Sequence, residues 1–299
     1  MMNNLDLRMR MRRVIRPNMQ ILLVIALIAA LPGLLVSVLT VLTGSDVWSY
    51  LFNHGVDTSV TPDRLLEAIE AYALERGWMT GLLSLMQALI TPVLTLGLIN
   101  AILTLLRGGT AVVTTAFSRL HAFLRAVGVA LITFVKVFLW SLPGAAVMLL
   151  AAFLLLQTRS LSVYSLLITA GAVLMMVLVI VASYRYIMAL FFLADEPEMG
   201  PLACVRQSKA VMKNRKIQLL SLELPYIAGN WVASSFISML LPGVIGTTLS
   251  MMAQLVFTVY IYGARCVFFE AYSRPGGGRA HAFQSDPYHS DDEMKDLLN

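Results

Sequence analysis

Charged side chains are scarce in this chain. They make up 13% of its 299 residues, whereas an average soluble domain has about 25%. Hydrophobic residues make up 58%, and several apolar runs exceed the roughly 20 residues that cross a hydrocarbon core of about 30 Å. A soluble core does not need runs of this length. The composition therefore excludes an ordinary soluble domain and predicts an all-α, polytopic membrane protein.

Cysteine and histidine are also rare. Cys204 lies in a basic segment and Cys266 in an apolar run, and their spacing resembles neither a metal site nor a disulfide framework. The four histidines all lie outside the apolar runs, at His54, His121, His281 and His289. No His-Glu-x-x-His, Gly-x-Ser-x-Gly or phosphate-binding glycine motif occurs. We therefore expect no enzymatic activity, no metal and no other cofactor.

Six apolar runs are long enough to span a membrane. They cover residues 19–43, 78–106, 126–156, 161–194, 217–240 and 246–272. The first is longer than the 7 to 15 residues, roughly, of a signal-peptide core, which favours a spanning helix over the alternative of a cleaved signal. The third contains Pro143 but is too short for two spans, so we expect one kinked helix. An odd number of spans, with one run re-entrant, is the alternative to six.

The charges of the loops predict the orientation. The N-terminal segment 1–18 carries five arginines and one acid, and the connector 107–125 carries three arginines and no acid. The segment 195–216 is also basic, whereas the loop 44–77 has six acids and two arginines, or four net negative charges. Because cytoplasmic loops carry an excess of Lys and Arg, we expect both termini in the cytoplasm. Residues 273–299 are expected to form a flexible cytoplasmic tail.

The acidic loop contains one predicted helix. Thr61, Pro62 and Asp63 form a typical helix start, and apolar residues then recur at helical spacing as far as Ala73. We expect a short amphipathic helix on the outer surface. It is interpreted as a cap on the bundle, with a binding site as the alternative.

Four charged residues fall inside the predicted spans: Lys136, Arg185, Glu223 and Arg265. At 1.5 Å per residue, the last three share a depth of roughly 10 Å from the cytoplasmic edge. An intramembrane charge is usually paired or faces water. The hypothesis is that Glu223 pairs with Arg185 or Arg265 inside the bundle. The alternative is that each arginine reaches the interface separately and Glu223 is hydrated.

A basic helix is predicted over residues 199–216, after a break at Asp195 and Pro197. At 100° per residue, four of its cations occupy one arc of about 80°: Arg206, Lys209, Lys213 and Lys216. We expect these cations to contact anionic lipid headgroups, each contact contributing about 1 kcal/mol. The alternative is that this segment only enforces the topology.

A motif in the second half of the chain comprises Tyr186, Ala189, Leu193-Ala194-Asp195, Pro197, Ser208-Lys209, Met212-Lys213 and Lys216. This motif resembles the signature of a bacterial integral-membrane family called domain of unknown function 975. Trp140 to Gly144 upstream, and Tyr260 and Phe268-Phe269-Glu270 downstream, are similar to two further elements. The similarity covers residues 115–272, and Asn214 stands where the family usually has glycine. The resemblance implies a six-span helical protein of the bacterial plasma membrane with no established activity.

The expected function follows from the basic helix. We expect a non-enzymatic protein that acts by lipid or protein contact at the cytoplasmic face. Its partners would be membrane lipids and, as an alternative, a membrane protein or a second copy of the chain, but not nucleic acid. The competing hypothesis is a permease or export accessory whose path passes the intramembrane charges.

Overall fold

The computed structural model describes residues 4–43, 70–158, 161–241 and 244–273, and these ranges contain helices and turns but no strand. This confirms the all-helical prediction for the part of the chain described. The helices are α1 (Asn4–Ile15), α2 (Met19–Leu42), α5 (Trp78–Leu106), α6 (Phe123–Thr158), α7 (Leu161–Tyr186), α8 (Ala189–Asp195), α9 (Pro201–Val211), α10 (Lys216–Leu240) and α11 (Val244–Tyr272). A π-helical turn, Ala73–Gly77, precedes α5, and two 3-10 turns, Val113–Phe117 and Leu120–Ala122, precede α6.

Five helical segments are long and apolar enough to cross a membrane. They are Met19–Thr40, Glu70–Leu106, Val113–Ala151, Leu166–Asp195 and Thr248–Tyr272. The fold is thus compatible with a multi-pass membrane protein. The predicted fifth span, 217–240, forms α10 but is not among these five within the described residues. Gln218, Glu223 and Asn230 make α10 more polar than the other long helices.

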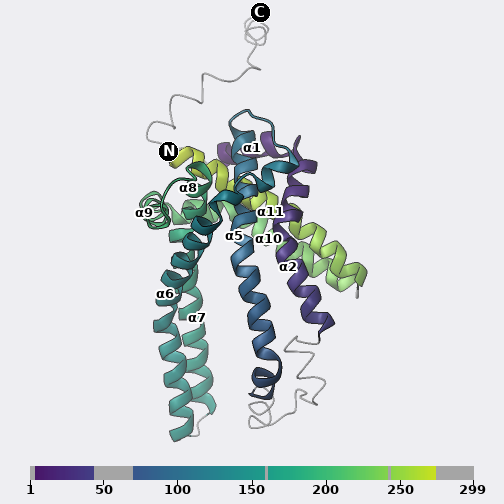
Figure 1. Ribbon diagram of the computed structural model, residues 1–299. Coiled ribbons are helices and arrows are strands. Elements are labelled where there is room, and N and C mark those ends of the chain that lie inside the picture. The colour runs from purple at the N-terminus through teal and green to yellow at the C-terminus, as the bar shows by residue number, and fades with distance from the viewer. Residues whose placement is uncertain (1–3, 44–69, 159–160, 242–243, 274–299) are drawn as a thin grey trace, which may run out of the picture.

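The long helices form three pairs. In Figure 1, α6 and α7 run side by side, and α2 packs against α5 and α10 against α11. The α10–α11 pair leaves the bundle obliquely, and its free end lies level with the middle of α6 and α7 (Figure 1). Two glycines let α6 and α7 approach closely: a Cβ on Gly144 would lie 2.6 Å from Met175 Cα, and one on Gly171 would lie 2.7 Å from Met148 Cγ.

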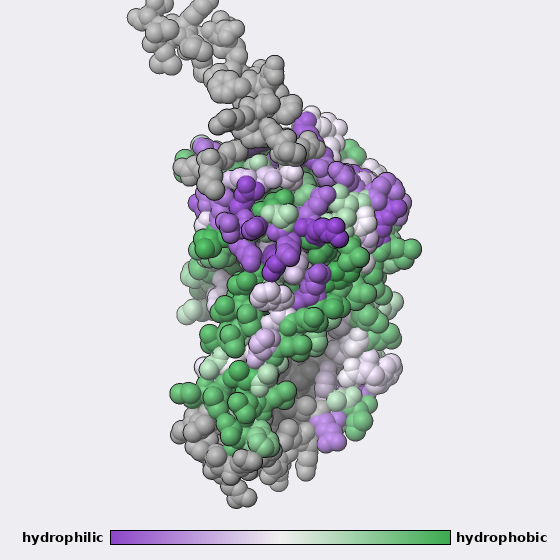
Figure 2. All heavy atoms as spheres, turned by 90° about the vertical axis from the view of Figure 1, so that its left-hand side faces the viewer, coloured by the Kyte–Doolittle hydropathy of each residue, from purple (hydrophilic) through white to green (hydrophobic). Residues whose placement is uncertain are grey.

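The core lies at one end of the bundle, where α1, α8 and α9 gather (Figure 1). We call this the polar end, because Figure 2 shows hydrophilic side chains concentrated there above a largely hydrophobic band. The rings of Phe191 of α8 and Phe269 of α11 are tilted against each other with centroids 5.9 Å apart, and Phe192 meets the Phe269 ring edge-on at 4.9 Å. Away from this end, large side chains such as Leu149 and Met239 are exposed, as expected of a surface that faces lipid.

The N-terminal segment, which was predicted only as a basic cytoplasmic stretch, folds back onto the core. Leu7, Met11 and Ile15 of α1 are fully buried, and α1 packs against α11. Gly263 of α11 permits this contact, since a Cβ there would overlap the side chain of Ile15. The arginines of α1 occupy the remaining faces, so the segment is an amphipathic helix with a buried stripe at four-residue spacing.

Two predicted helices have different bounds in the structure. The basic helix was expected over 199–216, but α9 ends at Val211, and Lys216 already begins α10. Asn214 has a φ of 63°, a left-handed conformation that helix interiors do not contain. The expected span 161–194 is interrupted after Tyr186, where a short turn separates α7 from α8. The start of the predicted outer helix and the tail beyond residue 273 lie outside the described residues.

Candidate functional site

A buried ion pair joins α10 to α11. Arg265 donates from Nε to Glu223 Oε1 at 2.8 Å and from Nη2 to Oε2 at 3.1 Å. The Tyr184 hydroxyl of α7 donates to the same Oε2 at 3.0 Å. Glu223 is completely buried, and its carboxylate accepts three hydrogen bonds from two other helices. A buried carboxylate is tolerated only with such compensation, so this cluster ties the α10–α11 pair to α7.

The other two cations that were predicted to lie inside the spans, Arg185 and Lys136, lie elsewhere, between α6 and α7. The Arg185 guanidinium lies over the Trp140 ring at 5.7 Å, and Lys136 Nζ lies over the Tyr186 ring at 5.6 Å. The structure therefore brings together Glu223 and Arg265 but not Arg185 or Lys136. Tyr184 was missed, although its position one residue before Arg185 places it at the same depth. A tyrosine in an apolar run is usually interpreted as a core side chain, so no sequence pattern distinguishes Tyr184 as a partner of Glu223.

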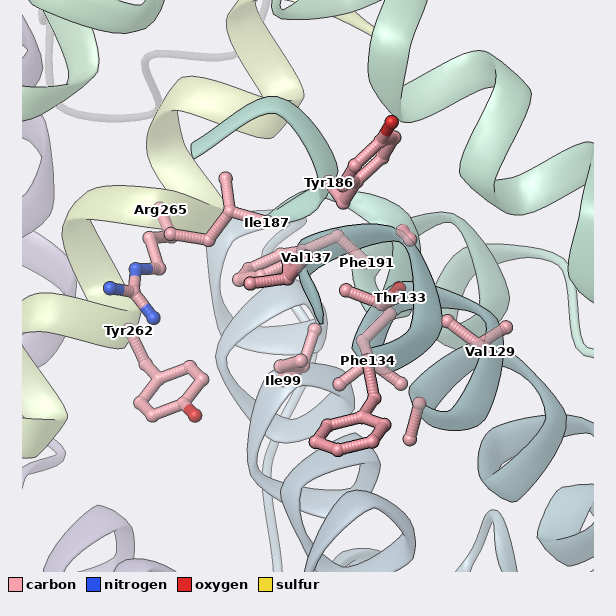
Figure 3. Close-up of a pocket in the computed structure, with 13 residues that line it drawn as sticks. Ile99, Val129, Thr133, Phe134, Val137, Tyr186, Ile187, Phe191, Tyr262 and Arg265 are labelled. Carbon is pink, nitrogen blue, oxygen red and sulfur yellow. The ribbon is translucent and has the colours of Figure 1, made fainter. Parts of the chain in front are cut away.

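A cavity of about 400 Å³ adjoins this cluster. In Figure 3, Val129, Thr133 and Val137 come from α6, Ile99 comes from α5, and Arg265 lies opposite on α11. Tyr186, Ile187 and Phe191 of the α7–α8 segment close one side. Apart from Arg265 and a few hydroxyl groups, the lining is apolar. The described residues include no group of three or more His, Cys, Asp or Glu that could hold a metal ion.

The cations of the predicted basic helix lie on the surface. Arg206 and Lys209 of α9 and Lys213 of the following turn are exposed, and Lys216 is half-buried at the start of α10. The opposite face of α9 is buried through Cys204, Val205 and Ser208. In the part of the chain that the structure describes, none of the four cations forms an ion pair.

Ser208 fixes α9 against the break between α7 and α8. Its hydroxyl is fully buried, accepts a hydrogen bond from the Met188 amide at 3.2 Å and donates to the Arg185 carbonyl at 3.2 Å. These are backbone groups that the interruption of the helix would otherwise leave unpaired. The motif position next to Lys209 therefore has a structural role, whereas Lys209 itself faces outward.

Asp195 belongs to a charged cluster that joins three helix ends. Arg107, just after α5, contacts Asp195 at 2.7 Å and donates from Nε to Glu270 of α11 at 2.6 Å. Burial lowers the pKa of Arg107, but the hydrogen bonds to both carboxylates outweigh this effect and leave its pKa raised. Asp195 was predicted only as a turn residue, and its contact with Arg107 could not be predicted, because nothing in the spacing of these residues indicates contact.

Pro197 lies in the turn that leads to α9. Its carbonyl accepts a hydrogen bond from Arg125 Nη1 at 2.6 Å, and Arg125 Nη2 contacts the exposed Glu198 at 2.9 Å. The contact with Arg125 lowers the pKa of Glu198. The contacts of Asp195, Pro197 and Ser208 therefore hold the α8–α9 segment against the bundle. They fix the position of the exposed cations of α9.

The chain matches the model of a known family. The family model described as "Protein of unknown function (DUF975)" matches residues 1–274. This confirms the suspected resemblance and extends it from 115–272 to include α1, α2 and α5. Comparisons with curated proteins and with solved structures gave no match.

Proposed function

The chain belongs to the DUF975 family, and on that premise we propose that it acts by contact with anionic lipid headgroups through the exposed cations of α9. The protein is then a non-enzymatic, multi-pass component of the bacterial plasma membrane, with the polar end and both termini in the cytoplasm. The expected excess of Lys and Arg on the cytoplasmic side supports this orientation, since α1, Arg125 and α9 all lie at the polar end.

The observation that carries the proposal is the placement of α9. Figure 1 shows α9 end-on beside the bundle, so its axis runs across the direction of α6 and α7. Figure 2, which looks onto this side, shows hydrophilic side chains directly above the hydrophobic band. An amphipathic helix in this position lies at the level of the headgroups. Its cations Arg206 and Lys209, with Lys213 next to them, are exposed and have no acidic partner in the described part of the chain.

The electrostatics favour anionic over zwitterionic lipid. A cation near an anionic membrane surface contributes about 1 kcal/mol, so three exposed cations contribute about 3 kcal/mol in low salt. Added salt shortens the Debye length to about 8 Å at 0.15 M and weakens the contact.

The Glu223–Arg265 pair also supports counting α10 as a sixth span. Glu223 is the only acidic residue of α10, and its pairing with Arg265 removes most of the cost of placing that charge in a membrane.

The test compares lipid-dependent stability in two matched variants. The full-length protein is purified in detergent, and its thermal unfolding is measured with added phosphatidylglycerol or phosphatidylcholine. The triple variant R206Q/K209Q/K213Q should lose most of the extra stabilisation by phosphatidylglycerol. The control R10Q/R12Q/R13Q removes three exposed cations from α1 and should retain it. Equal loss in both variants, or none in the α9 variant, would contradict contact through α9.

A permease or export accessory is the second candidate, favoured by the cavity beside Arg265. On this hypothesis, the path passes the Glu223–Arg265 pair and opens to the cytoplasm in part of the cycle. Cysteines introduced at Leu219, Leu222 and Tyr226, which are buried on α10, should then react with a polar thiol reagent added from the cytoplasmic side. Uniform protection of all three positions would refute this candidate.

A further inference from the structure

The cavity lies entirely among segments that can cross a membrane. All 13 of its lining residues belong to four of the five candidate spans. It has a volume of about 400 Å³, within the range of about 300 to 1,000 Å³ that is usual for ligand pockets. Phe134 at its edge is 67% exposed, on a surface of α6 that also exposes Leu131 and Phe138. The cavity therefore borders the surface that faces hydrocarbon rather than water.

The lining does not suit water or an ion. Its aliphatic and aromatic groups offer few of the two to four polar partners, roughly, that a buried water needs. Its one charged residue, Arg265, is already neutralised by a bidentate contact with Glu223. A free carboxylate or phosphate in the cavity would lie close to Glu223 without an unpaired cation among the lining residues. The electrostatics therefore favour an uncharged, largely apolar ligand.

Thr133 supplies one polar feature. Its Oγ1 is buried and has no hydrogen-bond partner among the described residues. Several other threonines in the candidate spans donate to the carbonyl four residues earlier, as Thr95 does to Thr91 at 2.8 Å and Thr258 to Gln254 at 2.8 Å. The hydroxyls of Thr91 and Ser250 are also unpartnered, but neither residue lines the cavity. Thr133 is thus a lining residue whose hydroxyl donor is unsatisfied within the described part of the chain.

From these observations we infer that the cavity binds one acyl chain of a glycerolipid, whose ester carbonyl oxygen accepts a hydrogen bond from Thr133 Oγ1. The lipid enters laterally from the bilayer, past Phe134. The apolar walls surround the chain, and the hydroxyl recognises the ester. This site is separate from the cationic surface of α9 and does not depend on it, since the chain and ester bind without a headgroup contact.

A cavity-filling substitution tests occupancy. Ala130→Phe places an aromatic ring at a lining position of α6, whereas Ala146→Phe places the same ring at an exposed position of the same helix. Native mass spectrometry of the full-length protein in mild detergent counts the lipids retained as phosphatidylglycerol is titrated. The wild type and A146F should saturate with one more tightly held lipid than A130F. Equal lipid counts in all three proteins would show that the cavity is only a packing defect.

A second substitution tests recognition of the ester. The relative affinity for diacyl and dialkyl-ether phosphatidylglycerol is measured by competition, because the ether lipid lacks the carbonyl acceptor. One neutral hydrogen bond predicts a preference for the ester lipid of roughly threefold to tenfold in the wild type. Thr133→Val should abolish this preference, and the control Thr258→Val should keep it. No preference in the wild type, or a preference that survives in T133V, would overturn the assigned role of Thr133.

Discussion

Replacing Glu223 by glutamine should strongly destabilise the protein. The carboxylate is completely buried and accepts two hydrogen bonds from Arg265 and one from Tyr184. Glutamine keeps the shape but removes the negative charge, so the guanidinium loses its counter-charge. Breaking a buried pair in this way costs about 3 to 5 kcal/mol. Because one acceptor oxygen survives in the amide, we expect about 3 kcal/mol, or more than roughly a hundredfold in the unfolding equilibrium.

The pair should also show strong thermodynamic coupling. In R265Q, Glu223 is left buried without its cation, whereas the double variant E223Q/R265Q contains no unpaired charge. The double variant should therefore be less destabilised than the sum of the single variants, with a coupling energy of about 2 kcal/mol or more. Tyr184→Phe removes one hydrogen bond and should cost only about 1 kcal/mol.

Equilibrium unfolding in mixed detergent and denaturant measures these changes. Glu198→Gln serves as the control, because that carboxylate is 81% exposed and should contribute nothing measurable. If E223Q has its unfolding midpoint at the same denaturant concentration as the wild type, the reasoning is refuted. Strict additivity in the double variant would also refute it, because the two groups would then be acting independently.

Further measurements test the packing between α6 and α7 and the burial of Cys204 in α9. Gly144→Ala would place a Cβ 2.6 Å from Met175 Cα and should destabilise the α6–α7 pair by about 1 to 3 kcal/mol. The control Gly81→Ala, with no atom within 4 Å of its Cβ, should be neutral or slightly stabilising. A lower thermal unfolding temperature for G81A than for G144A would contradict the close approach of α6 and α7. Burial raises the pKa of Cys204 to about 11, so its neutral thiol should resist maleimide at pH 7.5 until the protein unfolds, and rapid labelling of the folded protein would contradict this burial. Because the unfolded thiol ionises at lower pH than the folded one, this residue should lower the stability as pH rises from about 9 towards 11.

The existence and approximate bounds of five long helices could be predicted from apolar run length, and the family from its motifs. Five of the expected spans correspond to candidate spans in the structure, because a membrane demands continuous apolar helices. The burial of α1 could not be predicted in the same way. Its arginines dominate the composition of this segment. The apolar stripe of Leu7, Met11 and Ile15 is buried only because α11, with Gly263 opposite the stripe, packs against it.

At the candidate sites, too, the sequence predicts some features, but contacts between distant residues become evident only in the structure. Glu223, Arg185 and Arg265 lie at similar depths in their apolar runs, which indicated an ion pair with either arginine. The packing of α10 against α11 determines that the partner is Arg265. The cationic arc assumed one continuous helix to residue 216, and the left-handed Asn214 ends that continuity. The cavity has no sequence signature, because its apolar lining residues resemble those of any other span.

The most direct test of the proposed function is the position of α9 in a lipid bilayer. A spin label attached to Lys209→Cys is selective, because both native cysteines are buried. Its depth is measured from collision with oxygen and with a water-soluble nickel chelate, in vesicles with and without phosphatidylglycerol. Contact with headgroups predicts a label at the interface, shielded from the chelate in anionic vesicles. A label fully accessible to the chelate in both kinds of vesicle would contradict the contact.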